Sequence, residues 1–268
     1  LARFQLIEYL RAFLFGRLGW SPLNALLIIS GAFGAFYKER VIAIGGYRTQ
    51  TVGEDMDLVV RLHRSLRQEG RPYRISFVPD PICWTEAPAD LRSLKNQRMR
   101  WQRGLAESIA PNFGAMFDPR GGTVSWLALP FMFIFELVGP VIEVLGYLTM
   151  IPLFIFDLIP LQSFLVFLFL SIGLGVLLST NALFLEELSF QLYPRAGQQL
   201  KLFLIAVLEN FGYRQLTALW RCIAVIDWLF TFWKRSRWGK VARDGSWQSP
   251  TSTPKSDTEY SPSATIVP

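Results

Sequence analysis

The stretch 121–194 contains no lysine or arginine, although the 268-residue chain has 27 of them, 17 before this stretch and 10 after it. The same stretch contains long apolar runs, and apolar runs flanked by basic segments are typical of membrane spans. The chain as a whole is 51% apolar, with a mean hydropathy of +0.29, which is high for a soluble domain. The net charge is +6, and the basic residues flank apolar runs instead of forming one solvated patch. Nucleic acid is therefore not an expected partner.

We expect three apolar blocks, at about 126–156, 162–185 and 199–233. The first is long enough for one tilted helix with proline kinks, or for an interfacial piece followed by a span. The second predicts a single span. The third is interrupted around Asn210 to Gln215, so it predicts either a span followed by an amphipathic helix or two short spans.

Charged residues within and after these blocks add two expectations. Glu136 and Glu143 lie inside the first block, where a charge at the bilayer centre costs at least ~2.5 kcal/mol, so they should face other helices or a polar path. The basic run between Lys234 and Arg243 favours a cytoplasmic end and an even number of crossings. Residues 244–268 are rich in Ser, Thr and Pro, which predicts disorder.

The first 120 residues have the patterns of a mixed α/β fold. Residues 1–20 carry apolar positions at helical spacing, which predicts a helix on a membrane surface or one packed in a core. Residues 25–29 predict a short buried strand, and Ser30 and Gly31 open a glycine-rich loop that is either a turn or a contact with a ligand. Residues 74–78 alternate in polarity, which predicts a second strand, ended by Pro79-Asp80-Pro81.

A helix is predicted from Thr51 to Gly70, with an acidic first turn. Glu54 and Asp55 would lie at the positive end of the helix dipole, which stabilises an ionised carboxylate and lowers its pKa. Plain helix capping accounts for the same pattern. His63, the single histidine, lies in mid-helix, where it predicts a solvated or packing residue rather than a catalyst.

A second helix is predicted from about Leu91 to Ala110, with Asp90 as its N-cap. It is rich in arginine, which suits phosphate oxygens, and it carries Trp101, which suits a sugar face or a membrane interface. An ordinary basic interfacial helix is the alternative. The two cysteines, Cys83 and Cys222, have different surroundings, so neither a disulfide nor a metal site is expected from them.

Several motifs occur in an order that resembles the membrane-embedded family 2 glycosyltransferases, the group of cellulose, hyaluronan and poly-N-acetylglucosamine synthases. Ser30-Gly31-Ala32-Phe33-Gly34 is similar to the S-G-A-F-G segment of that family. Gly53-Glu54-Asp55 is similar to its E-D motif, although many members have Thr where this chain has Gly53. Gln97, Arg98, Arg100 and Trp101 match Q-[QR]-x-R-W, and Trp238-Gly239-Lys240 with Arg243 resembles a juxtamembrane motif of the bacterial branch.

The resemblance implies a role for each matching residue. Asp55 would be the general base that takes a proton from an acceptor sugar hydroxyl while that oxygen attacks the anomeric carbon of a nucleotide sugar. Trp101 would stack on the acceptor sugar. Arg98 and Arg100 would hold the diphosphate leaving group, with Gln97 as a hydrogen-bonding partner. Glu54 is expected among the acceptor- or diphosphate-binding residues, and Ser30 and Gly31 are expected as loop contacts.

The resemblance also implies what this chain would lack. The nucleotide-binding half of the fold, with the D-x-D that binds Mg²⁺ or Mn²⁺ and the diphosphate, is expected to precede Leu1, so the chain alone should not bind donor productively. Asp55-Met56-Asp57 spells D-x-D but opens a helix inside the base motif. We therefore expect no metal ligands from this chain.

The expected fold is α/β plus membrane α-helical: a partial A-type glycosyltransferase domain, its acceptor half, followed by transmembrane helices. The expected domains are 1–120, the cytoplasmic transferase part; 121–233, the membrane region; and 234–268, a basic segment and disordered tail.

The expected protein is an integral membrane enzyme of the bacterial inner (plasma) membrane. It would transfer a sugar from a UDP-sugar to a growing polysaccharide, with inversion of configuration at the anomeric carbon. Membrane lipid would be a further partner. A non-processive glycolipid synthase, a non-catalytic membrane subunit or remnant, and a transporter are the alternatives.

Overall fold

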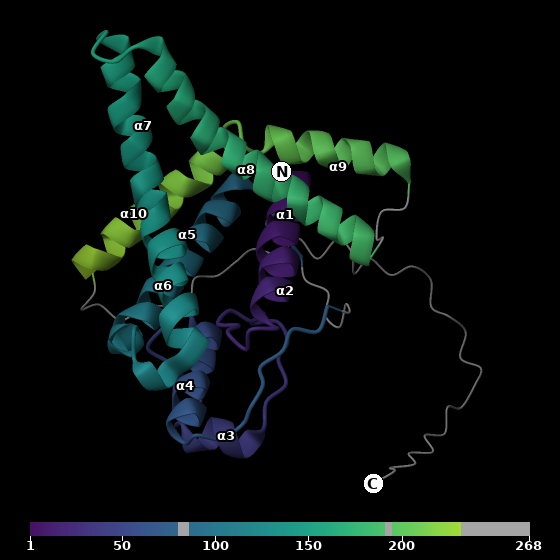
Figure 1. The fold of residues 1–268 in the computed structure, drawn as a ribbon, viewed down its shortest axis with the longest axis vertical. Helices are drawn as coiled ribbons and strands as arrows, with labels where there is room; N and C mark the ends of the chain where they lie inside the picture. The colour runs from purple at the N-terminus through teal and green to yellow at the C-terminus, as the bar shows by residue number, and fades with distance from the viewer. Residues whose placement is uncertain (80–85, 191–194, 232–268) are drawn as a thin grey trace.

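The computed structural model describes residues 1–79, 86–190 and 195–231, and these residues are mostly helical (Figure 1). The N-terminal helix is one rod in three parts: α1 (Ala2–Tyr9), a π-helical segment (Leu10–Phe15) and α2 (Gly16–Trp20). Its predicted extent is therefore confirmed. Ile7 is fully buried against Leu202 and Ala206, so one face of this helix is packed against the protein. Its position on a membrane surface stays a prediction.

The α/β expectation is not confirmed, because no strand forms among the described residues and the nearest feature is an isolated bridge between Ser30 and Phe33. The predicted strands at 25–29 and 74–78 are extended, but neither is paired in a ladder, which a strand requires. Side chains bind backbone groups of the second segment instead. The amide of Asn24 donates to Tyr73 O (2.9 Å) and its Oδ1 accepts from Ile75 N (2.9 Å). Asp80 and Pro81 lie outside the described residues.

Three helices follow before residue 120: α3 (Lys38–Ala43), α4 (Glu54–Gln68) and α5 (Leu91–Ile109). Gly70, just beyond α4, has φ +65°, a conformation that suits glycine at a helix end. Asp90 caps α5 as predicted, because its Oδ1 accepts from Ser93 N (2.8 Å) and its Oδ2 from Ser93 Oγ (2.6 Å). Both long predicted helices are thus confirmed.

The chain leaves α5 through two 3₁₀ turns, Ala110–Ala115 and Pro119–Gly121. It then forms a continuous helical series of two π-helical segments, Val124–Ala128 and Met132–Val138, that flank α6 (Leu129–Phe131) and lead into α7 (Gly139–Ile155).

Prolines shape this series. Pro140 has no N–H, so the carbonyl of Glu136 cannot accept the helical hydrogen bond that the residue four positions later would donate. That carbonyl accepts instead from Gln102 Nε2 (2.9 Å) of α5 and from Arg221 Nη2 (2.7 Å) of α10. The interruption of the helical hydrogen bonds at Pro140 is therefore also the place where this helix is hydrogen-bonded to α5 and α10.

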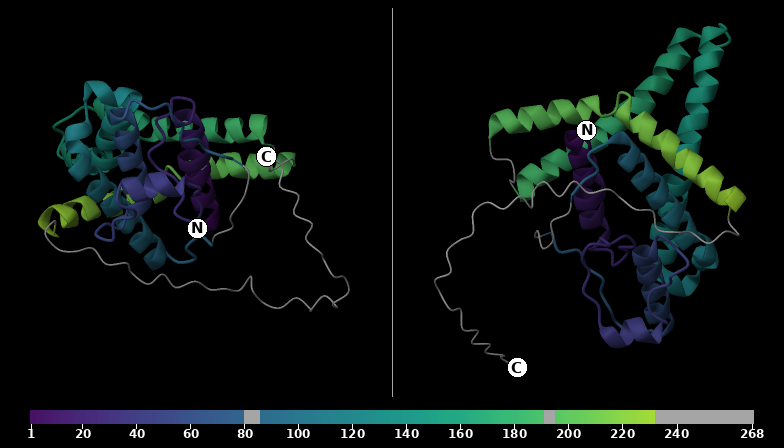
Figure 2. Two further views of the ribbon diagram at one scale, coloured as in Figure 1. Left: turned by 90° about the horizontal axis from the view of Figure 1, so that it is seen from below. Right: turned by 180° about the vertical axis from the view of Figure 1, so that it is seen from behind.

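Helices α7 and α8 (Leu161–Ser189) form a hairpin that projects from the rest of the molecule (Figures 1 and 2). Two helical stretches of the described residues, Val124–Ile155 and Leu161–Ser189, are long and apolar enough to cross a membrane. Only 6% of the most apolar part of α8 is buried, which differs from the core helix of a soluble protein. The side chains of α8 instead present their apolar surface outward.

The third apolar block forms two helices, α9 (Ala196–Leu208) and α10 (Tyr213–Thr231), separated at the predicted interruption. Glu136 and Glu143 face other helices as expected. Glu136 Oε2 lies 2.8 Å from Arg221 Nη2, and Glu143 Oε2 lies 3.3 Å from Arg214 Nη2. These two glutamates of the first apolar block are thus paired with arginines of α10. The basic run and the tail, including Trp238, lie outside the described residues.

The main hydrophobic core joins the first 120 residues to the first apolar helix. It contains residues of the extended segment 25–29, of α4, of α5 and of the series that begins at Val124, among them Leu27, Val60 and Leu129. Because the extended segment before the glycine-rich loop, the acidic helix and the arginine-rich helix share this core, they are held in fixed positions around the candidate site.

Candidate active site

Asp55 lies in the first turn of α4 and is half-buried. Its Oδ1 accepts a hydrogen bond from Met56 N (2.8 Å). Burial raises the pKa of this carboxyl above its ordinary value, while backbone N–H groups at the helix start and the charge of Arg17 act in the opposite direction. The prediction that the helix start lowers the pKa of Asp55 overall is therefore wrong: the helix has that effect, but burial outweighs it.

Gly31 lies directly beside Asp55, and its expected role as a loop contact stays a prediction. A Cβ added to Gly31 would stand 3.3 Å from Asp55 Oδ2. Glycine at this position leaves that carboxylate oxygen uncovered. The hydroxyl of Ser30, in contrast, accepts from Ala32 N (3.4 Å) within the loop itself.

Glu54 is partly buried next to Asp55, and its Oε2 is buried without a hydrogen-bond partner among the described residues. Burial is the main cause that raises its pKa, and the neighbouring charge of Asp55 adds to the rise. The positive charge of Arg100 on α5 opposes it. The structure thus brings the E-D pair and one arginine of the second motif into one electrostatic environment.

The loop before α4 is joined to the middle of α5 by a contact between two glycines. A Cβ on Gly53 would stand 2.6 Å from Gly104 O, closer than real Cβ atoms come to any backbone atom. Ser108 Oγ lies within hydrogen-bond distance of the carbonyl oxygens of Gly53 (3.2 Å) and Gly104 (2.7 Å). Glu107 Oε2 also accepts from Val52 N (3.0 Å). The two motifs, far apart in sequence, are therefore fixed to each other through the backbone.

Arg98 is buried, with 2% of its surface exposed. Its Nη2 donates to Glu8 Oε2 (2.6 Å) and its Nη1 to Gln97 Oε1 (2.6 Å). The guanidinium also lies 4.4 Å from the centre of the Trp101 ring. A diphosphate would have to compete with these contacts for Arg98, and its predicted role stays a prediction.

Trp101 is 39% exposed on the face of α5 that meets the N-terminal helix. Its ring centre lies 6.3 Å from that of Tyr9 and 5.8 Å from that of Phe13. These aromatic rings and Arg98 fix the orientation of the indole while part of it stays open. That combination suits an aromatic platform for a sugar ring.

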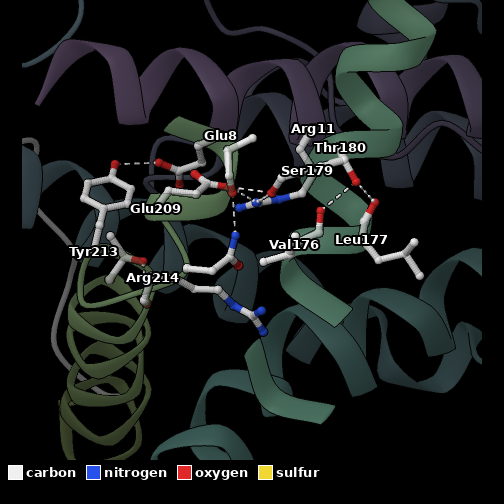
Figure 3. Close-up of polar contacts among 12 residues, drawn as sticks. Glu8, Arg11, Val176, Leu177, Ser179, Thr180, Glu209, Tyr213 and Arg214 are labelled. Carbon is white, nitrogen blue, oxygen red and sulfur yellow. Dashed lines mark hydrogen bonds and ion pairs between the residues drawn. The ribbon is translucent and has the colours of Figure 1, made fainter. Parts of the chain in front are cut away.

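The sequence analysis missed Glu8, whose carboxylate holds Arg98 and also accepts from the hydroxyl of Tyr213 (2.8 Å) on α10. One turn further along, Arg11 is ion-paired with Glu209 and donates to Ser179 Oγ (2.5 Å) of α8 (Figure 3). The N-terminal helix thus connects the Q-x-x-R-W helix to the apolar helices through charged side chains. Glu8 and Arg11 are charged residues on a mostly apolar helix, and this was the sequence signal that could have identified them.

Asp57 does not fit a metal site, although it completes the D-x-D spelling. Its Oδ2 accepts from Arg61 Nε (2.8 Å) and its Oδ1 from Arg48 Nη1 (3.3 Å). Arg61 in turn donates to the carbonyl oxygens of Ile44 and Gly46. The carboxylate of Asp57 therefore anchors the 44–46 turn to α4, and no cluster of three potential metal-ligating side chains occurs in the part of the chain that the structure describes.

His63 is a packing residue, and the solvated alternative is wrong. It is fully buried, with Nε2 2.9 Å from Leu26 O and Nδ1 2.7 Å from the hydroxyl of Tyr73. Burial lowers its pKa to about 4. The neutral ring therefore fastens the extended segment before the Ser30 loop to the helix that carries Asp55. Cys222 is a buried free thiol on α10, and Cys83 lies outside the described residues.

Comparison with known proteins supports this grouping of motifs. The family model described as glycosyl transferase family group 2 matches residues 10–180. A poly-beta-1,6-N-acetyl-D-glucosamine synthase of Staphylococcus aureus strain COL is 35% identical over 115 residues, which cover 42% of this chain and 26% of the relative. The protein of the same description from Staphylococcus epidermidis strain ATCC 35984 is 29% identical over 113 residues, with the same coverage of both chains.

These matched regions amount to about a quarter of the length of the curated relatives. No solved structure matches the chain. The family match nevertheless includes the segments around Ser30, Asp55 and Trp101, the first apolar block and most of the second. The chain therefore belongs to glycosyl transferase family group 2.

Proposed function

We propose that this chain forms the acceptor side and membrane part of an inverting glycosyltransferase that extends a polysaccharide at a bacterial membrane. The observation that carries the proposal is the contact between Gly53 and Gly104, which holds the loop of Asp55 against the helix of Trp101. A base and an aromatic platform on one rigid unit are what a reaction at a sugar hydroxyl requires.

In the proposed reaction, Asp55 accepts the proton of an acceptor hydroxyl while that oxygen forms a bond to the anomeric carbon of the donor. The bond from that carbon to the nucleoside diphosphate breaks, and its electron pair leaves with the diphosphate. Attack opposite the leaving group inverts the configuration, so an α-linked donor gives a β-glycoside. The open side of Asp55 at Gly31 is where the hydroxyl would approach, and Trp101 would stack on the acceptor ring.

The relatives narrow the choice of donor. Both are described as synthases of a β-1,6-linked N-acetylglucosamine polymer, so UDP-N-acetylglucosamine is the first donor to test. The apolar helices α7 and α8 would hold the enzyme in the membrane, with the transferase part on the cytoplasmic side. A non-processive glycolipid synthase and a non-catalytic membrane subunit are the competing functions.

The test uses membranes that contain the protein expressed from its complete reading frame, a panel of radiolabelled UDP-sugars and Mg²⁺. Wild type is compared with Asp55→Asn and Trp101→Ala, and with Glu69→Gln, an exposed carboxylate at the end of α4, as a matched control. We expect one sugar to be incorporated, Asp55→Asn to abolish transfer at equal protein level, and Glu69→Gln to have no effect. Transfer by Asp55→Asn at the wild-type rate would contradict the assignment of the base.

Product length separates the competing enzymes. A processive synthase gives a long membrane-associated polymer that grows with time, whereas a glycolipid synthase gives a product of fixed small size. If no donor is used by wild type, the non-catalytic alternative gains support.

A further inference from the structure

Arg17 is a buried arginine that uses none of its N–H groups in a hydrogen bond within the described chain. It lies in α2 and is 9% exposed. Its Nε is fully buried without a partner, and no ion pair of the described residues includes it. Since a buried guanidinium normally has its donors satisfied, this side chain is an exception that needs an explanation.

Two aromatic rings position the guanidinium of Arg17. Its central carbon lies 4.5 Å from the ring centre of Phe13 and 5.7 Å from that of Phe77. Cation–π contacts orient a guanidinium through its flat face, and they leave the N–H groups at its edge available. Arg17 is therefore held in place with its donors unused by the residues that the structure describes.

The charge of Arg17 acts on the candidate base. It lowers the pKa of Asp55, although no direct ion pair joins the two side chains in the described part of the chain. Burial without a paired anion lowers the pKa of Arg17 itself to about 10, so the side chain stays protonated at neutral pH. A positive charge that acts on the candidate base thus has no anion paired with it among the described residues.

We propose that Arg17 binds the diphosphate of the donor and of the released nucleotide, an inference that rests on the proposed function. An N-acetylglucosamine acceptor, the kind of polymer named for the relatives, is neutral, so the diphosphate is the reactant whose permanent negative charge matches this cation. A planar guanidinium with free N–H groups binds phosphate oxygens in a bidentate manner. Arg98, in contrast, already donates to Glu8 and Gln97. The proposal adds a residue that the motifs do not include.

Equilibrium binding of UDP tests this without turnover. The protein from the complete reading frame is purified in detergent with Mg²⁺, and UDP binding is measured by calorimetry for wild type, Arg17→Met and Arg17→Lys. Arg64→Met, at an exposed arginine of α4, is the matched control. We expect Arg17→Met to weaken UDP binding by about tenfold or more, Arg17→Lys to recover part of the loss, and Arg64→Met to bind as wild type does. Unfolding temperatures of all variants identify any loss of fold.

The outcomes separate this inference from the proposed function. If Arg17→Met binds UDP like wild type and only shifts the pH dependence of transfer, Arg17 acts on Asp55 alone and the inference is overturned. If wild type binds UDP through Arg17 but transfers no sugar, the anion site stands and the proposed function fails. If wild type transfers sugar and Arg17→Met leaves the KM for the donor unchanged, the inference fails while the function stands.

Discussion

Gly53 and Gly104 touch through their backbones, and neither position has room for a side chain. A Cβ on Gly104 would stand 2.9 Å from both Cα and N of Gly53. Gly53 belongs to the segment that resembles the E-D motif, in which many family members have threonine, and this chain departs from that motif at a position that α5 approaches closely. The close approach gives the departure a physical reason, because a threonine here would collide with the backbone of Gly104.

The substitution Gly104→Ala should therefore weaken both the fold and the transfer reaction. Inserting a methyl group into a closed contact costs about 1–3 kcal/mol, and relief of the collision would move Asp55 away from Trp101. Thermal unfolding and transfer rate are the measurements. Gly114→Ala is the control, because a Cβ at Gly114 has no atom within 4 Å. Equal unfolding temperatures for Gly104→Ala and Gly114→Ala would show that Gly53 and Gly104 are not in close contact.

Loss of the Glu8 carboxylate should destabilise the protein strongly. Glu8→Gln leaves Arg98 buried without its anion, and breaking one side of such a pair costs about 3–5 kcal/mol. We expect a lower unfolding temperature and a higher KM for the acceptor, because Arg98 also holds the ring of Trp101.

The double variant Glu8→Leu with Arg98→Met provides the control for this prediction. Replacing both charges by apolar groups removes the uncompensated cation, so stability should return in part while the KM for the acceptor stays high. If Glu8→Gln is as stable as wild type, the ion pair does not hold the helix in the way the structure indicates.

The single histidine should make stability depend on pH. The pKa of His63 is about 4 in the folded protein and about 6.5 in an unfolded chain. Between these values the unfolded chain binds the extra proton, so stability is complete above about pH 6.5 and falls as the pH drops toward 4. At pH 5 the loss is about 2 kcal/mol.

Unfolding temperatures at pH 7.5 and pH 5 measure this effect. The variant His63→Gln cannot titrate, so the difference between the two temperatures should shrink relative to wild type. The acidic groups titrate in both proteins, and the comparison isolates the histidine because the chain has no other. An unchanged pH dependence in His63→Gln would show that the ring is not buried in its neutral form.

Asp55→Asn should stabilise the fold at neutral pH while it abolishes transfer. Because burial raises the pKa of Asp55 in the folded state, the folded protein keeps this proton when the unfolded chain has lost it. Stability from this group is therefore present at low pH and is lost as the pH rises through the folded pKa. Asparagine does not titrate, so the Asp55→Asn variant does not lose this stability as the pH rises.

The measurement is the difference in unfolding temperature between Asp55→Asn and wild type from pH 3 to pH 8. The variant should gain stability relative to wild type as the pH rises through this range. A variant that is less stable than wild type at pH 7 would mean that the ionised carboxylate is well solvated or paired, contrary to its half-buried position beside Gly31.

The sequence by itself predicted most of the helices. The extents of α4 and α5, the cap at Asp90 and the interruption near Asn210 follow from apolar periodicity and from local side-chain-to-backbone hydrogen bonds. Such features depend on residues a few positions apart, so a local pattern is enough to specify them. The motifs likewise identified Asp55 and Trp101 as residues to examine.

Only the tertiary structure decided what those residues touch. Glu8 is 90 positions from Arg98, and Gly53 lies more than 50 positions from Gly104. The extended segments at 25–29 and 74–78 show the same limit, because a strand needs a hydrogen-bonded neighbour and none of the described segments pairs with them in a ladder. The burial of Arg17 and the lack of an acceptor for its donors among the described residues are also tertiary properties, since both arise from packing. Local pattern determines helix positions, whereas partners and pKa values depend on which distant groups the packed chain brings together.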